Sequence, residues 1–353
     1  MSDVLLRELS NSDIDWMVAN GQRIEIASDT ILIQPKETLE SIYLLLSGAL
    51  SLGISAGASS DRQEITRLTQ GEIVGEAPIF DTPSLAEIRA VEDSLVLAIP
   101  RQALLEKLRH DIQFGAHFYR AIALIMAERL RQLLEMPGQI QDASSHPGQD
   151  ALLIFGEFRD SDIDWMTMMG RVEKVPPGYL LIQAGKPIDA LHIILDGVFT
   201  VLVTDGDYNS LTLCFDCAEK TASTMRPISN LTRGELAGTI SFLDFRLPPI
   251  TVRAARESLV LSISRQQMTS HLQNNKGFAA RFYRVLAMQL SHSLQSVLSR
   301  LGCDESSFDA SQQMDEALDY EDELDLDALH HVSQGAARFN WMMKRLGVGS
   351  SMA

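Results

Sequence analysis

The sequence predicts an α+β protein with two tandem β jelly-roll domains, each closed by C-terminal helices, and an acidic C-terminal tail. Three observations lead to this prediction. The chain of 353 residues has the length of about two domains, at roughly 150 residues each. The sequence repeats itself once along its length. In each copy, several short apolar runs precede a long segment with the periodicity of a helix.

The internal repeat is most evident in a six-residue stretch. Residues 12–17 (SDIDWM) recur unchanged at 161–166, an offset of 149. The tripeptide FYR at 118–120 recurs at 282–284, an offset of 164. The growth of the offset places one insertion, of about 14 residues, between residues 202 and 231. A period near 150 exceeds the ~20–50 residues of a solenoid unit, so it indicates a duplicated domain.

The hydrophobic pattern predicts the strands and helices of each copy. Short β-type runs are separated by Gly, Asp or Pro, as in a sandwich or jelly roll. A long segment then carries apolar residues at every third or fourth position, which is the spacing of one helix face. In the first copy the predicted strands are 31–33, 41–46, 49–54, 64–68 and 94–99, and the predicted helices are 103–109 and 115–134.

Composition sets the boundaries between the parts of the chain. Domain 1 is predicted at residues 1–135 and domain 2 at residues 151–302. Residues 136–150 have the Gly, Pro, Ser and Gln content of a linker. Residues 303–327 hold eleven acids and no Lys or Arg, which predicts a solvated acidic tether. Residues 328–353 form an amphipathic C-terminal segment.

The C-terminal segment has the pattern of a docking helix. Its far end is basic, and Gly335 is expected to interrupt the helix. An isolated helix of this length is marginal in water, so we expect it to dock in a groove, on domain 2 or on a protein partner. On this hypothesis, removing the segment leaves both domains folded. The residues that step by three and four are Leu329, Val332, Ala336, Phe339, Met343 and Leu346.

Charge and composition exclude several classes of protein. The net charge of −17 argues against a nucleic-acid-binding protein, whose surface would be basic. No apolar run approaches the ~18–20 residues of a membrane span. The N-terminus lacks the apolar core of a signal peptide, and three cysteines do not make a disulfide framework. We therefore expect a soluble cytoplasmic protein without a cofactor.

Motifs for catalysis and metal binding are weak. Residues 53–57 (GISAG) match G-x-S-x-G, but they lie at a hairpin tip and not at a strand-to-helix elbow. Cys214 and Cys217 form a C-x-x-C without the second pair that zinc needs. His192 stands among apolar neighbours, as a core histidine does, and the histidines at 330–331 are typical of a solvated pair. We expect neither an enzyme nor a metal site.

A strand–Gly–strand segment and a Gly-Glu segment carry a family resemblance. Residues 42–50 (IYLLLSGAL) are echoed by 191–199 (LHIILDGVF). Residues 71–80 (GEIVGEAPIF) look like the start of a phosphate-binding cassette, and a strand and a long closing helix follow. On these residues, each copy resembles the cyclic-nucleotide-binding domains of catabolite-activator-type regulators and kinase regulatory subunits. The resemblance covers roughly 9–135 and 158–301.

This resemblance implies a binding site in domain 1. In such a cassette a short helix presents backbone N–H groups to the cyclic phosphate. A carboxylate holds the ribose 2′-hydroxyl, and an arginine neutralises the phosphate. Gly75 and Glu76 match the Gly-Glu pair, with Ala77 next in the cassette. The arginine position falls on Ser84, which is followed by Leu85, so the cassette departs from the family pattern at its charged residue.

The second copy departs further from the family pattern. Gly238 matches the glycine, but Thr239 replaces the glutamate. Pro248 stands at the arginine position, and Arg246 lies two residues earlier, where it is a candidate substitute for the phosphate ligand. Loss of a charged partner of a phosphate costs about 2–5 kcal/mol. Any nucleotide is therefore expected to bind mainly in domain 1.

The sequence supports two hypotheses for the function. In the first, the chain is a non-enzymatic regulatory protein that binds a cyclic nucleotide of the cAMP class in domain 1. Movement of a closing helix then signals to a protein partner, through the C-terminal segment. In the alternative, both pockets are degenerate, and the chain is a scaffold that binds protein partners and no nucleotide.

Overall fold

The computed structural model describes residues 4–55, 62–80, 84–135, 151–204, 225–302 and 326–348. These residues divide into two compact units. The first unit contains the described residues up to Leu133 and, in addition, those from Leu286 to the end of helix α11. The second contains the described residues from Leu134 to Val285 and helix α12. The predicted linker lies outside the described residues, and so does the predicted tether except for its last two residues, which begin α12.

Two short helices, α1 (Val4–Glu8) and α2 (Asn11–Asn20), open the first unit. Ser10 caps α2, because its hydroxyl accepts a hydrogen bond from the Asp13 N–H at 3.3 Å. The Asp13 carboxylate accepts one from the Ser10 N–H at 2.8 Å. This reciprocal pair satisfies two donors at the helix start, so the local sequence fixes where α2 begins.

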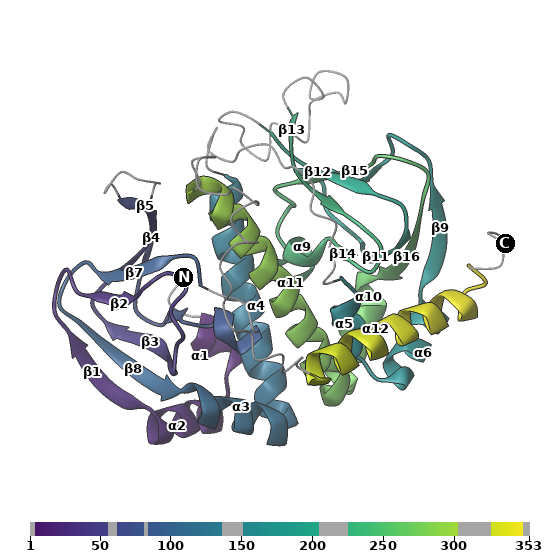
Figure 1. The fold of residues 1–353 in the computed structure, drawn as a ribbon. Coiled ribbons are helices and arrows are strands. Elements are labelled where there is room, and N and C mark those ends of the chain that lie inside the picture. The colour runs from purple at the N-terminus through teal and green to yellow at the C-terminus, as the bar shows by residue number, and fades with distance from the viewer. Residues whose placement is uncertain are drawn as a thin grey trace, which may run out of the picture. The chain divides into compact units, whose positions relative to one another are not determined.

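Eight strands form the β domain of the first unit (Figure 1). They make two antiparallel four-stranded sheets with the orders β1-β8-β3-β6 and β2-β7-β4-β5. Neighbours that are not consecutive in sequence are typical of a jelly roll. The strands are β1 (Gln22–Ile26), β2 (Ile31–Ile33), β3 (Ser41–Ser47), β4 (Leu50–Ser55), β5 (Arg62–Leu68), β6 (Ile73–Val74), β7 (Glu87–Ala90) and β8 (Ser94–Pro100).

The glycine between β3 and β4 explains the repeated strand–Gly–strand segment. Gly48 has a φ of +88°, and a Cβ there would lie 2.3 Å from the Ser94 hydroxyl. Its counterpart Gly197 has a φ of +109°, and a Cβ would lie 2.0 Å from the Ser258 hydroxyl. Both the backbone conformation and the space therefore require glycine.

Helices α3 (Arg101–His110) and α4 (Ile112–Leu134) close the first domain. Phe114 and Phe118 of α4 are fully buried, and their rings stack with centroids 5.7 Å apart. Burial of such aromatic side chains is the main stabilising term of a helix-on-sheet core.

The second copy of the repeat has the same order of elements, although the part of its last helix, α11, from Leu286 onward belongs to the first unit. Its sheets have the orders β14-β11-β16-β9 and β10-β15-β12-β13. The prediction of two tandem jelly-roll domains closed by helices is therefore confirmed. The elements are α5 (Ala151–Glu157), α6 (Asp160–Met169), β9 (Arg171–Val175), β10 (Leu180–Ile182), β11 (Ala190–Asp196), β12 (Phe199–Thr204), β13 (Met225–Leu231), β14 (Leu236–Ala237), α9 (Thr239–Asp244), β15 (Thr251–Ala254), β16 (Ser258–Ser264), α10 (Arg265–Asn274) and α11 (Lys276–Gly302).

The predicted insertion falls between two strands of the second domain. Six residues separate β4 from β5, whereas twenty separate β12 from the equivalent β13. The difference accounts for the change of offset in the repeat. The residues of this insertion, with Cys214 and Cys217, lie outside the described residues.

Helix α12 (Leu326–Arg345) packs on α5 and α6 within the second unit (Figure 1). Phe339 is fully buried, and its ring lies edge-to-face with Phe155 at 4.9 Å between centroids. Arg338 of α12 donates to the Gly156 carbonyl at 2.7 Å. The expected docking on domain 2 is thus observed.

The expected interruption at Gly335 is wrong. The helix runs through this residue without a break. A glycine inside a helix costs only about 1 kcal/mol relative to alanine, and burial of Phe339 and Met342 outweighs that cost.

His192 on β11 is a core histidine, as the sequence predicts. Its Nδ1 lies 2.8 Å from the Ser262 hydroxyl, and burial lowers the pKa of His192 from 6.5 to about 4. Between about pH 4 and pH 6.5, His192 therefore carries a proton in the unfolded chain but not in the folded chain.

We expect the second domain to lose stability as the pH falls from about 6.5 to about 4, because His192 must become charged on unfolding. The loss between pH 7 and pH 5 should be about 2 kcal/mol. Urea unfolding at the two pH values measures it, with His192→Gln as the non-titrating control. An equal pH dependence in the variant would contradict the assignment.

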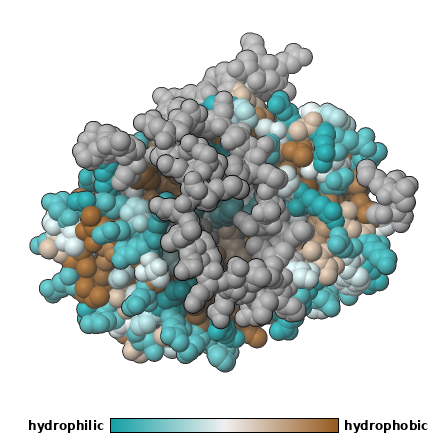
Figure 2. Space-filling model, viewed as in Figure 1, coloured by the Kyte–Doolittle hydropathy of each residue, from teal (hydrophilic) through white to brown (hydrophobic). Residues whose placement is uncertain are grey.

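On the face shown in Figure 2, hydrophilic residues predominate, and hydrophobic ones form small groups. Among the helices that the structure describes, none has the length and apolar character needed to cross a membrane.

Candidate functional site

The predicted cassette of domain 1 begins at a glycine with a left-handed backbone. Gly75 follows β6 with a φ of +83°, a conformation that favours glycine. A Cβ at this position would lie 3.3 Å from the Leu39 Cδ1 and from the Ser41 carbonyl oxygen. Glu76 comes next, followed by a 3₁₀ helix at Ala77–Phe80. The turn thus directs Glu76 into the interior of the domain.

Glu76 forms a buried ion pair with an arginine of the closing helix. The relative exposure of Glu76 is 6%, and that of Arg129 on α4 is 5%. One terminal nitrogen of Arg129 donates to the Glu76 carboxylate, and the other donates to the Ile73 carbonyl. The carboxylate that the resemblance assigns to a ribose hydroxyl is therefore bound to a guanidinium in this structure.

The residues at the arginine position form a turn. The Ser84 hydroxyl donates to the Ala86 carbonyl at 3.3 Å, and the Ser84 carbonyl accepts from the Lys36 N–H at 2.7 Å. The N–H of Leu85 donates to the side-chain oxygen of Gln295 at 3.0 Å. Gln295 lies on the part of α11 that belongs to the first unit.

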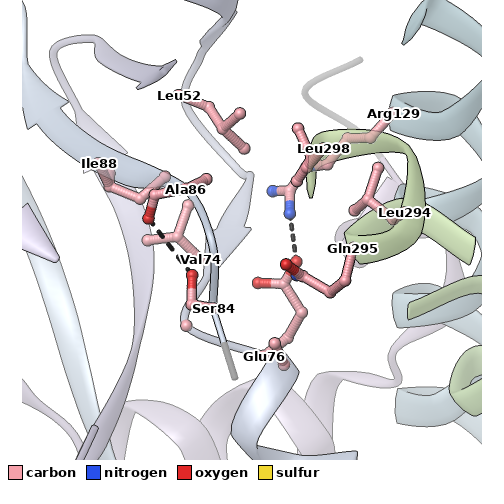
Figure 3. A pocket seen from close by; sticks show the side chains of 12 residues that line it. Leu52, Val74, Glu76, Ser84, Ala86, Ile88, Arg129, Leu294, Gln295 and Leu298 are labelled. Carbon is pink, nitrogen blue, oxygen red and sulfur yellow. Dashed lines mark hydrogen bonds and ion pairs between the residues drawn. The ribbon is translucent and has the colours of Figure 1, made fainter. Parts of the chain in front are cut away.

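A small cavity lies at the centre of this arrangement, between the cassette and helices α4 and α11 (Figure 3). Gly75, Glu76, Ala77 and Ser84 line it, so the structure brings together four of the five residues predicted for domain 1. Leu85 contributes its backbone N–H. The remaining lining residues are Leu52, Val74, Ala86, Ile88, Arg129, Leu294, Gln295 and Leu298.

The cavity is far too small for a nucleotide. Its free volume is about 20 Å³, enough for roughly one water molecule. Pockets for small ligands usually have about 300–1,000 Å³. A nucleotide does not fit in the volume that these residues leave.

The equivalent residues of domain 2 have different surroundings. Gly238 has a φ of +95° and precedes α9, and Thr239 is buried. Arg246 is half exposed, and its Nε pairs with the Asp244 carboxylate at 3.0 Å. In this arrangement Arg246 is paired with the last residue of α9.

Sequence reasoning missed Arg129 and Gln295, because both lie on helices whose periodicity indicates only packing. The repeat does contain a signal for Arg129. At the offset of 164, Arg129 corresponds to Ser293, and in the same copy Thr239 takes the place of Glu76. Both charges of the pair are thus absent together from the second copy, which indicates that they depend on each other.

The weak motifs for catalysis and metal binding lie largely outside the described residues. In the part of the chain that the structure describes, no group of three or more His, Cys, Asp or Glu side chains is placed to hold a metal ion. Of the G-x-S-x-G motif, only residues 53–55 are described, and they end β4. The side chains at 330–331 lie outside the description.

Comparison with known families identifies the class of protein. The model of the family "Cyclic nucleotide-binding domain" matches residues 23–111 and 172–275, which together are more than half of the chain. The chain therefore belongs to this family and contains two such domains in tandem. A search of curated proteins gives no match.

Several solved structures are similar to the chain at low identity. A structure described as "cAMP bound PfPKA-R (141-441)" is 13% identical, covers 86% of this chain and 88% of its own, and has a TM-score of 0.31. The regulatory domain of Toxoplasma gondii PKA with cAMP is 13% identical, with coverages of 76% and 87% and a TM-score of 0.29. The regulatory subunit of a cAMP-independent protein kinase A from Trypanosoma brucei is 18% identical, with coverages of 76% and 83% and a TM-score of 0.29. At such TM-scores, these likenesses carry no argument about ligands or partners.

Proposed function

We propose that the chain is a cytoplasmic, non-enzymatic regulatory protein that binds a cyclic nucleotide of the cAMP class in domain 1. On this proposal, ligand entry moves a closing helix, and the movement changes a contact with a protein partner, through the C-terminal segment. The partner is neither a nucleic acid nor a membrane. The observation that carries the proposal is the cavity itself, because the cassette and helices α4 and α11 line it.

This geometry couples binding to movement. A ligand shifts a conformational equilibrium only by its difference in affinity for the two states. Here the difference is large, because the state described by the structure has almost no room for a nucleotide. Any nucleotide that binds must therefore select a state in which α4 or α11 has moved.

The charges at the site favour weak binding. Ser84 supplies no positive charge to a phosphate, which lowers the expected affinity by roughly 30- to 4,000-fold. Arg129 does bring a guanidinium into the cavity. If Glu76 exchanged this guanidinium for a ribose hydroxyl, Arg129 would be free to bind the phosphate.

A specific observation also favours the alternative, a scaffold that binds proteins and no nucleotide. Glu76 and the Leu85 N–H, the two groups that a nucleotide would use, are both bound by side chains of the chain itself. Calorimetric titration with cyclic AMP, cyclic GMP and cyclic dinucleotides separates the two functions. Binding of any of them supports the sensor, and no binding at millimolar concentration supports the scaffold.

If a nucleotide binds, we expect Glu76→Gln to weaken binding at least about tenfold, because the charged acceptor for the ribose is lost. Glutamine keeps the shape of the side chain. Thr239→Val in domain 2 is the matched control and should change the affinity little. Equal effects of the two substitutions would contradict the assignment of the site to domain 1.

A further inference from the structure

The amide oxygen of Gln295 accepts a hydrogen bond from a backbone N–H of the cassette. It accepts from the Leu85 N–H at 3.0 Å, next to the position where the family pattern has its arginine. A backbone N–H can donate to an oxygen of a ligand as well as to a side-chain oxygen. An uncharged carbonyl oxygen therefore takes the place that an oxygen of a ligand would need.

Two leucines on the same helix face complete this contact. Leu294 and Leu298 flank Gln295 at spacings of one and three residues, and their relative exposures are 4% and 2%. All three line the cavity, opposite the strand residues Leu52 and Ile88 (Figure 3). Their apolar side chains form this side of the cavity lining.

We propose that Leu294, Gln295 and Leu298 form a built-in plug of the domain 1 site, and that a nucleotide must displace this plug to bind. The inference rests on the proposed function and concerns its regulation. By sequence the plug belongs to the closing helix of the second copy, yet it packs in the first unit. Binding in domain 1 therefore moves a helix that the duplicated domain supplies.

The plug satisfies a polar group that lines the site. Glu76 and the Leu85 N–H would be costly to bury unpaired. Arg129 satisfies the first and Gln295 the second. Because Gln295 is uncharged, it leaves the Leu85 N–H more readily than a carboxylate would, since charge-assisted hydrogen bonds are about twice as strong.

The test compares Gln295→Ala with the full-length wild-type chain by calorimetric titration with cyclic AMP. We expect at least a fivefold gain in affinity, because the plug no longer competes for the Leu85 N–H and the cavity is larger. Gln295→Asn, which keeps the amide but shortens the side chain by one methylene, should shift the affinity in the same direction. The matched control is Gln273→Ala, an exposed glutamine on α10, and it should leave the affinity unchanged.

A second measurement needs no nucleotide. Amide hydrogen exchange at Leu85, followed by NMR, should be faster in Gln295→Ala than in the wild type and unchanged in Gln273→Ala. Unchanged exchange at Leu85 would overturn the plug, as would an equal or weaker affinity of Gln295→Ala when the wild type binds. If no variant binds a nucleotide, the proposed sensor function is wrong. The exchange rate at Leu85 then shows by itself whether Gln295 protects this N–H.

Discussion

Replacement of Arg129 with serine is expected to destabilise the first domain by about 3–5 kcal/mol, because Glu76 would remain buried without its partner. Both side chains are almost inaccessible to solvent, so water cannot take over the lost contact. The change also removes the hydrogen bond to the Ile73 carbonyl. Urea unfolding of the full chain measures the effect, as a lower midpoint at an unchanged slope.

The duplicated domain supplies the control for this prediction. It carries Thr239 and Ser293 at the positions of Glu76 and Arg129, and Thr239 is buried without a charge. The double variant Glu76→Thr/Arg129→Ser should therefore recover most of the stability that Arg129→Ser loses. Replacing a buried ion pair as a whole is often neutral, whereas breaking it is not. A double variant as unstable as the sum of the single ones would contradict mutual dependence.

The second large effect concerns helix α12. Phe339→Ala is expected to destabilise the second domain by about 3–5 kcal/mol, the usual cost of removing a buried phenyl ring. The ring has no exposed surface, contacts Phe155 and lies 4.8 Å below the guanidinium of Arg233. Thermal unfolding measures the loss. Lys344→Ala, on the exposed face of the same helix, should leave the unfolding temperature unchanged.

Removal of α12 as a whole should have a still larger effect. The sequence alone suggested that residues 328–353 form a segment whose loss leaves both domains folded. The structure favours another outcome, because Phe339 and Met342 are part of the core of the second unit. A truncated chain that unfolds at the wild-type temperature would show that the segment only docks on a complete domain.

Features that depend on local conformation could be predicted from the amino-acid sequence alone. The repeat defined two domains, and the alternation of short apolar runs with Gly, Asp and Pro predicted five of the eight strands of the first domain. The strand–Gly–strand pattern placed Gly48 between two strands, and the structure adds the reason, a positive φ that favours glycine. The absence of an arginine at Ser84 also followed from the sequence, since the cassette is a continuous segment.

The side chains that fill the site could not be predicted in this way, because they come from distant parts of the chain. Arg129 lies 53 residues from Glu76, and Gln295 lies 210 residues from Leu85. Hydrophobic periodicity shows which face of a helix is buried, but it does not show which polar atom on that face meets which partner. That depends on the rotation and position of α4 and α11 against the sheets, which many weak packing contacts set together. The same reason applies to α12, whose apolar face was visible in the sequence while its partner Phe155 was not.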